Sequence, residues 1–270
     1  MASPPSPLPI DRFHEQGFHV ERDVIDEDEL QLFGREIRRL HKVALTLDGS
    51  AQSGDFQREP YADGANDDAG LPILRKIENT RRHSPAFAEL SRHPIIVQRV
   101  HELLGEDDLL LFRSTLMLKP AFHGSVHGLH QDSAYWPMDP PQLVTVSIAL
   151  TDAAADNGCF QVIPASHTWG LQEWKGLARE QDAALTDRRD IDPQSATTVP
   201  LRAGSALFFH SLLVHGSGPN QSSRPRHTAL YAYFSPQVRY LPPEGAPRER
   251  SFPVISGMEG APTAVLTAAD

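Results

Sequence analysis

The residues with the clearest potential for chemistry are His130 and Asp132, separated by one residue, and His215 much later in the chain. Two imidazoles and one carboxylate on one face of a metal ion leave other coordination positions open, and non-haem Fe(II) oxygenases use this ligand set. Zinc sites are built from the same residue types. Because an H-x-D tripeptide also arises by chance, the surrounding sequence has to support the assignment.

The one-residue gap between His130 and Asp132 has a geometric reason. In an extended strand, residues i and i+2 point to the same side, so both side chains can converge on one ion while Gln131 points away. The third ligand then comes from a different strand. His210 lies five residues before His215 and would face the opposite side of such a strand, so only one of the two fits the site.

Other histidines compete with this assignment. His127 lies three residues before His130, and an odd offset points two side chains apart in an extended segment. His19 and Glu21 repeat the spacing of a histidine and an acid, but no partner histidine has matching surroundings. We therefore expect neither His127 nor His19 to be a ligand.

A basic residue after His215 indicates a second binding function. Arg226 follows His215 by eleven residues, and Thr228 would face the same side of one strand. A 2-oxo acid bound to Fe(II) can supply the electrons that reduction of O₂ requires, and its far carboxylate then needs a cation. The planar fork of arginine matches a carboxylate in a bidentate manner. The competing interpretation is a surface arginine in the run Arg224-Pro225-Arg226.

Composition sets the broad class of the protein. The 270 residues are 40% hydrophobic and 22% charged, which is typical of a globular enzyme. A net charge of -10 argues against nucleic acid as a partner. The single cysteine, Cys159, excludes an intrachain disulfide and favours a reducing compartment. With no signal-like N-terminus and no membrane-length apolar stretch, we expect a cytoplasmic protein that acts on a small molecule away from membranes. The sequence carries no signal for an oligomeric state.

The hydrophobic pattern predicts helices first and strands later. Residues 1–9, rich in proline and serine, predict a disordered lead-in. A single domain over 10–270 is expected to comprise a mostly helical flank (10–105), a β core (106–240) and a C-terminal extension (241–270). The predicted architecture is mainly β with flanking helices.

Several local signals support this division. Asp26 and Glu29 have the spacing of a helix capping box, Ser84-Pro85 begins another helix, and a last helix ends at Gly105. The predicted strands of the β core are Leu109–Leu118, Leu143–Leu150, Phe160–Ile163, Thr198–Leu201, Ala206–Phe209 and Thr228–Phe234.

Two polar stretches fall outside these elements. Asp48 to Gly70 is rich in Gly, Ser, Asp and Asn, which predicts a long loop and the best candidate for a lid, with Phe56 in it. Gln172 to Pro193 is charged and is expected to be a helix or an excursion between strands. The basic residues in segments that could reach the mouth of a pocket are Arg58, Arg75, Lys76, Arg81, Arg82 and Arg113.

Taken together, these motifs resemble those of the phytanoyl-CoA dioxygenase (PhyH) family of Fe(II)/2-oxoglutarate-dependent oxygenases. The N-terminal Phe13 to Leu40 segment also resembles the start of that family, so the similarity covers most of residues 10 to 240. The segments that carry the resemblance are His130 to Pro137 (HQDSAYWP), Asp156 to His167 (DNGCFQVIPASH), Ala203 to His210 (AGSALFFH), and His215 to Asn220 (HGSGPN) continuing to Arg226.

The resemblance implies a double-stranded β-helix core (a jelly roll, as in cupins) and a set of site residues. His130, Asp132 and His215 are implied as the Fe(II) ligands. Arg226, with Thr228, is implied to bind 2-oxoglutarate, the co-substrate that reacts together with O₂. Lys119 matches a basic position that can lie near the co-substrate.

Some positions depart from the family pattern without removing a ligand. Ala165 stands where glycine is usual, Ser205 where an acidic residue is common, and Ser147 where an aromatic residue is frequent. Ser147 therefore leaves open what lines that wall of the pocket. Tyr135 and Trp136 follow the ligand pair directly and, with Ser147 and Phe56, are the candidate substrate-binding residues.

The identity of residue 132 predicts the reaction type. Halogenating relatives leave a small residue there for chloride, whereas Asp132 fills the coordination position, which favours hydroxylation or another oxidation of an unactivated C–H bond. 2-Oxoglutarate would become succinate and CO₂. The alternatives are a non-catalytic jelly-roll sensor of metal and 2-oxoglutarate, and a zinc hydrolase. The sensor need not retain all three ligands and Arg226, and the hydrolase leaves Arg226 without a role.

Overall fold

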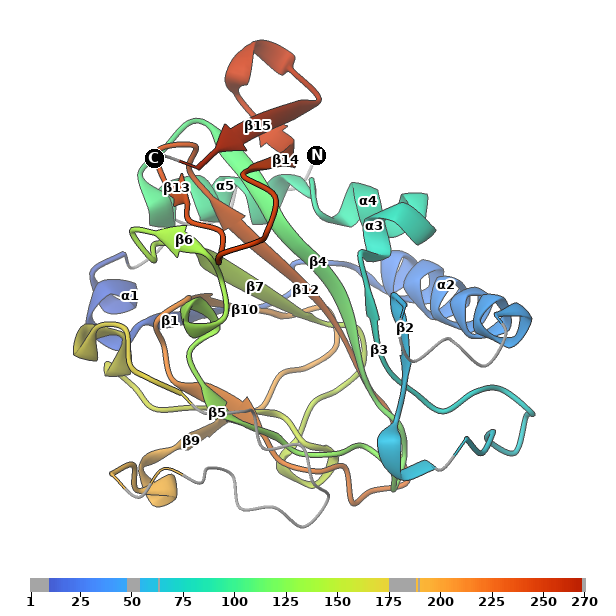
Figure 1. The fold of residues 1–270 in the computed structure, drawn as a ribbon. Coiled ribbons are helices and arrows are strands. Elements are labelled where there is room, and N and C mark those ends of the chain that lie inside the picture. Colours follow the sequence, from blue (N-terminus) through green and yellow to red (C-terminus); the bar gives the residue numbers. More distant parts are fainter. Residues whose placement is uncertain (1–9, 48–53, 63, 175–187, 189, 269–270) are drawn as a thin grey trace.

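Two antiparallel β-sheets face each other, and helices cover the outer face of the larger sheet (Figure 1). The computed structural model describes residues 10–47, 54–62, 64–174, 188 and 190–268. The expected lead-in at 1–9 and most of the stretch from Gln172 to Pro193 lie outside these ranges. In the described part of the chain, no helix combines the length and the apolar character that crossing a membrane requires.

The larger sheet has nine strands, of which seven follow one continuous path of hydrogen-bonded neighbours. Its strands are β1 (Phe18–Glu21), β2 (Phe56–Arg58), β3 (Leu74–Glu78), β4 (Leu109–Lys119), β7 (Val144–Ala149), β10 (Ala206–His210), β12 (Arg226–Phe234), β14 (Glu249–Ser256) and β15 (Thr263–Thr267). The path runs β1-β10-β7-β12-β4-β14-β15, with β3 beside β4 and β2 beside β3. In Figure 1, β4, β12 and β7 cross the molecule side by side.

The smaller sheet carries the motif histidines. Its four strands are β5 (His127–His130), β8 (Phe160–Val162), β9 (Thr197–Val199) and β11 (His215–Ser217), in the order β5-β11-β8-β9. A separate pair joins β6 (Met138–Asp139) to β13 (Arg239–Tyr240). The two facing sheets form the jelly-roll core, so the predicted fold class is confirmed.

The described α-helices are α1 (Ile10–Gln16), α2 (Glu27–Thr46), α3 (Thr80–His83), α4 (Pro85–Leu90) and α5 (Pro94–Leu104). Three of them, α2, α4 and α5, form where the sequence signals predict them, whereas α1 and α3 were not predicted. At the start of α2, Asp26 accepts a hydrogen bond from the Glu29 amide at 2.9 Å, and Glu29 accepts one from the Asp26 amide at 2.9 Å. Gly105 ends α5 in the left-handed region, at φ 69°.

The two largest hydrophobic clusters of the described residues hold the layers together. The main core lies between the helices and the outer face of the larger sheet, where Leu40 of α2 and Val100 of α5 join Val146 of β7. A second core lies between the sheets and includes Phe160 and Phe209. Successive side chains of β7, β10 and β12 point alternately into the main core and into the space between the sheets. The side chains that point between the sheets can therefore form a site there.

The predicted loop from Asp48 to Gly70 is wrong in part. Phe56 begins strand β2, which pairs with β3, and its ring is buried in the main core beside His83, with ring centroids 4.9 Å apart. A three-residue strand among Gly, Ser and Asp has no periodicity of its own, and its pairing partner lies outside the loop. Phe56 is therefore a core residue, and the prediction that it binds substrate or serves a lid is not supported. The C-terminal extension likewise contributes two strands, β14 and β15, to the larger sheet.

Candidate metal centre

His130 and His215 lie directly opposite each other on neighbouring strands. They are register partners in the β5–β11 pair, and their ring centroids are 4.3 Å apart. This close approach depends on Gly216, where an added Cβ would lie 2.7 Å from the His127 carbonyl oxygen. Both histidines are buried, each 4% exposed. Residues far apart in the sequence thus present two imidazoles at one point between the sheets.

Asp132 lies just beyond the end of β5, in a short 3-10 helix (η3, Asp132–Ala134). Gln131 before it is still extended, at φ -107° and ψ 131°, so Asp132 keeps the same side as His130, as the spacing predicts. The Gln131 side chain points away, donates to the carbonyls of Gly170 and Leu212, and accepts from the Trp174 indole. These bonds fix the backbone between the two candidate ligands.

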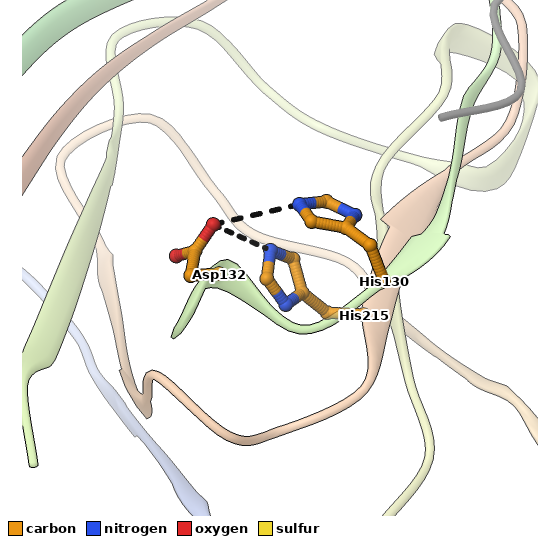
Figure 2. Close-up of side chains that lie close together, drawn as sticks. All are labelled: His130, Asp132 and His215. Carbon is orange, nitrogen blue, oxygen red and sulfur yellow. Dashed lines mark ion pairs between the residues drawn. The ribbon is translucent and has the colours of Figure 1, made fainter. Parts of the chain in front are cut away.

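The three side chains converge (Figure 2). The Asp132 Oδ1 atom lies 3.4 Å from His130 Nε2 and 3.8 Å from His215 Nε2. One ligand atom from each residue lies within 4.8 Å of the others, which is a spacing that a single metal ion can bridge. Among the described residues, no other group of three His, Cys, Asp or Glu side chains meets this criterion.

Hydrogen bonds orient both imidazoles for metal binding. His130 Nδ1 lies 2.9 Å from the Gly128 carbonyl oxygen, and His215 Nδ1 lies 2.9 Å from that of Leu213. A carbonyl can only accept, so each ring donates from Nδ1 and leaves the Nε2 lone pair directed at the shared point. This arrangement is the usual one for histidines that bind a metal.

Electrostatics favour the protonation states that a metal requires. Burial by itself would raise the pKa of Asp132, but the adjacent imidazoles of His215 and His130 lower it to about 2. Burial and the neighbouring His130 lower the pKa of His215 to about 4. At neutral pH the cluster therefore holds an ionised carboxylate and a neutral imidazole, which are the forms that bind metal ions.

Thr145 of β7 supports the cluster, a role that the sequence did not predict. Its hydroxyl donates to Asp132 Oδ2 at 3.0 Å, which leaves Oδ1 directed at the histidines. Thr145 is buried, 4% exposed. In the sequence it is one of two polar residues in an otherwise apolar strand, and only the alternation of β7, which puts it on the inward face, could have indicated it.

A cavity of about 340 Å³ opens onto the three residues. It lies between the sheets, and β4, β12 and β7 form one wall. Besides the metal cluster and Thr145, the polar residues that line it include Lys76, Arg113, His127 and Arg226, and the aromatic ones include Tyr135, Trp136 and Phe209. The predicted pocket residues Tyr135 and Trp136 therefore lie where expected, and Lys76 and Arg113 reach the cavity as well.

Arg226 is a buried cation at this cavity. It is 2% exposed, its guanidinium carbon lies 5.4 Å from the Phe160 ring centroid, and its Nη1 group donates to the Gly158 carbonyl. The Nε atom has no hydrogen-bond partner, and no carboxylate of the described residues forms an ion pair with the side chain. Burial lowers its pKa to about 10, so it stays protonated at neutral pH. A buried positive charge without a counter-ion is a strong indication of an anionic ligand.

The remaining predicted residues lie near this site without lining the cavity. Thr228 is buried two residues beyond Arg226 on the same face of β12. Lys119 pairs with Arg226 across β4 and β12, and its ammonium donates to the Ser125 carbonyl at 2.5 Å and the Gly218 carbonyl at 2.7 Å. Ser147 is fully buried on the inward face of β7, two residues beyond Thr145, and its hydroxyl has no partner among the described residues.

The competing histidines have other surroundings. His210 accepts a hydrogen bond from the Leu212 amide and lies beside His167, away from the cluster. His19 lies 3.3 Å from Glu21, which also binds Arg99. His127 lines the cavity, with its ring 5.0 Å from that of His130, but it is not part of the three-residue cluster.

Comparisons with known proteins agree with this site. The family model described as phytanoyl-CoA dioxygenase (PhyH) matches residues 13–228. The rat peroxisomal phytanoyl-CoA dioxygenase is 26% identical over 249 residues, covering 88% of this chain and 70% of the relative. An ectoine dioxygenase of Nocardia farcinica is 27% identical over 257 residues, covering 89% and 82%.

A solved structure extends the comparison to bound ligands. The epimerase SnoN in complex with Fe³⁺, alpha ketoglutarate and nogalamycin RO is 26% identical, covers 86% of this chain and 84% of that one, and superimposes with a TM-score of 0.64. The residues that match the family model include all three members of the cluster, His130, Asp132 and His215. The chain belongs to the phytanoyl-CoA dioxygenase family of Fe(II)/2-oxoglutarate-dependent dioxygenases.

Proposed function

We propose that this protein hydroxylates an unactivated C–H bond of a small-molecule metabolite, and that 2-oxoglutarate is converted to succinate and CO₂ in the reaction. His130, Asp132 and His215 would hold Fe(II). The observation that carries the proposal is the combination, in one cavity, of a three-ligand cluster and a buried arginine without a counter-ion.

The residues fit both absent groups. The cluster supplies two imidazole nitrogens and one carboxylate oxygen, which suits Fe(II) with positions left open. The free Nε of Arg226 and its buried charge suit a carboxylate of 2-oxoglutarate. When bound, the iron would supply a site for O₂, which is the oxidant of the C–H bond, and 2-oxoglutarate would supply two electrons as it is converted to succinate and CO₂.

The protein's own groups would orient the metal ligands and the co-substrate. Gln131 and Thr145 fix Asp132, and the two backbone carbonyls fix the imidazoles. Arg226 would anchor the co-substrate from the inner part of the jelly roll. Because Asp132 occupies the third ligand position, halide cannot take it, which favours hydroxylation over halogenation.

The relatives argue against a purely sensory role, because those described above are named as dioxygenases or as an alpha ketoglutarate-dependent epimerase. Their names include phytanoyl-CoA, ectoine and nogalamycin. These compounds are chemically diverse, so the substrate of this chain has to be sought in its own cavity.

The test is a metabolite screen with Fe(II)-loaded protein, 2-oxoglutarate and O₂. The expected result is a compound that stimulates succinate formation and gains one oxygen atom by mass spectrometry. Coupled succinate formation with loss of two hydrogens would change the outcome from hydroxylation to desaturation. Absence of succinate under all conditions, in protein that binds Fe(II), would refute the proposal.

A further inference from the structure

The wall of the cavity formed by β3 and β4 carries a charged cluster that the metal site does not use. It consists of Lys76 and Glu78 on β3 and Arg113 on β4. Arg113 donates to Glu78 from Nε at 3.1 Å and also from Nη2, and Lys76 Nζ donates to the same carboxylate at 2.7 Å. Both cations line the cavity that contains the metal ligands.

Sheet register places this cluster relative to the metal site. Arg113 is opposite Ala232 on β12, and Ala232 is opposite Thr145 on β7, so the three residues form one row across the sheet. Thr145 holds Asp132, and Arg113 lies two strand spacings from it, about 10 Å between Cα atoms. Arg113 therefore faces the cavity level with the metal cluster.

Arg226 lies in a different direction. It is six residues from Ala232 along β12, about 20 Å at the rise of an extended strand. The cavity thus has two cationic ends. From the row that contains Thr145, Arg226 lies along the direction of the strands, and Arg113 lies across the strands within that row. A co-substrate that joins the metal to Arg226 leaves Arg113 for another ligand.

The geometry of Arg113 leaves part of its guanidinium available. Glu78 occupies the Nε–Nη2 edge, and Thr115 also accepts from Nε at 2.9 Å. Within the described residues, no hydrogen bond uses the Nη1 group, and the side chain is 36% exposed. The outer edge of a guanidinium can donate two parallel hydrogen bonds to a second carboxylate.

The charges at this end favour an anion. Burial opposes ionisation of Glu78, but Arg113 and Lys76 lower its pKa to about 2, so it is a carboxylate at neutral pH. Within the cluster, two cations therefore face one carboxylate. The adjacent lining is largely apolar, with Met117, Trp136 and Leu230, so the cavity combines one cationic end with an apolar body.

We infer that Arg113, held by Glu78, is a specificity-determining residue that binds an acidic group of the substrate, and that the substrate is a small organic acid with an apolar skeleton. This inference rests on the proposed function, because it places the acid in the same cavity as the metal. It excludes neutral hydrocarbons as preferred substrates. The alternative is that the cluster only joins β3 to β4.

The test measures binding of matched acid and amide pairs, which differ in charge but share a skeleton. The probes are 3-phenylpropanoate with 3-phenylpropanamide, and octanoate with octanamide. Calorimetric titration uses the full chain loaded with Mn(II), which stands in for Fe(II), under saturating 2-oxoglutarate so that Arg226 is occupied. We expect the wild type to bind at least one acid tenfold or more tightly than its amide.

Three variants separate recognition from folding. Arg113→Gln should abolish the preference for the acid, whereas Glu78→Gln, which removes a negative charge, should enlarge it. Arg39→Gln is the matched control, because Arg39 of α2 pairs with Glu36 in a similar way but does not line the cavity. It should retain the wild-type preference.

The inference is overturned by equal binding of acid and amide, by no binding of either acid, or by an unchanged preference in Arg113→Gln. It is also overturned if Arg113→Gln weakens 2-oxoglutarate binding tenfold, since Arg113 would then belong to the co-substrate site. Succinate formation by the Fe(II)-loaded wild type separates failure of this inference from failure of the proposed function, because uncoupled turnover of 2-oxoglutarate does not depend on the probes.

Discussion

Replacing Thr145 by valine tests how the jelly roll prepares its metal ligand. Valine has nearly the same branched shape and the same preference for strands, so the exchange removes little except the hydroxyl. That hydroxyl donates to Asp132 Oδ2 at 3.0 Å in a buried setting. Without it, Asp132 loses one charge-assisted hydrogen bond and can rotate away from the histidines.

The expected magnitude follows from that single bond. A hydrogen bond to a charged group contributes about 1.5–3 kcal/mol, and each 1.4 kcal/mol corresponds to a factor of ten in affinity. Residues that support a metal ligand in this way typically contribute about 10- to 100-fold to metal affinity. Because a metal that binds Oδ1 offsets part of the carboxylate charge, we expect the loss of Mn(II) affinity in Thr145→Val to lie in the lower part of that range. Thr145→Ser, which keeps the hydroxyl, should recover most of the affinity.

Anaerobic calorimetric titration with Mn(II) measures the effect directly. Thr198→Val provides the matched control, because Thr198 lies on the exposed edge strand β9 and does not contact the cluster. We expect unchanged Mn(II) affinity in this control. Wild-type affinity in Thr145→Val, with the fold intact by circular dichroism, would refute the role assigned to the hydroxyl.

Three further predictions follow from the site. Arg226→Met should weaken 2-oxoglutarate binding by more than about 30-fold, the cost of removing one partner from a buried charge pair, and should leave Mn(II) affinity near that of the wild type; equal weakening of both would contradict the assignment. Gly216→Ala should abolish tight Mn(II) binding, because its Cβ would lie 2.7 Å from the His127 carbonyl oxygen and force β11 away from β5; retained binding would show that the strands can adjust. Gln131→Ala should lower the free energy of unfolding by about 3 kcal/mol or more, because it leaves several buried groups without partners; a loss below about 1 kcal/mol in urea denaturation would refute the bridging role.

The candidate metal ligands could be predicted from the sequence because strand geometry constrains their spacing. Side chains alternate between the two faces of an extended chain. This alternation places His130 and Asp132, two residues apart, on one side. It places His210 and His215, five residues apart, on opposite sides. The extended strand does not continue through Asp132, because a short 3-10 helix begins at that residue. The prediction still holds, because only the conformation of Gln131 decides on which side Asp132 lies.

The supporting residues were less accessible because their partners are distant in the chain. Nothing near Thr145 in the sequence indicates that it meets Asp132, since that contact joins β7 of the larger sheet to the turn after β5 of the smaller one. The Glu78–Arg113 pair joins strands separated by three helices. Phe56 was predicted wrongly because its neighbours in the sequence are polar and indicate a loop, whereas its ring is buried in the main core.

We propose that His130, Asp132 and His215 form an iron site that turns over 2-oxoglutarate. The most direct measurement is succinate formed in air by protein reconstituted anaerobically with Fe(II), compared between the wild type and His215→Ala. We expect Fe(II)-dependent succinate in the wild type, even without substrate, and none above background in the variant. Equal succinate in both proteins, or turnover supported equally by Zn(II), would contradict it.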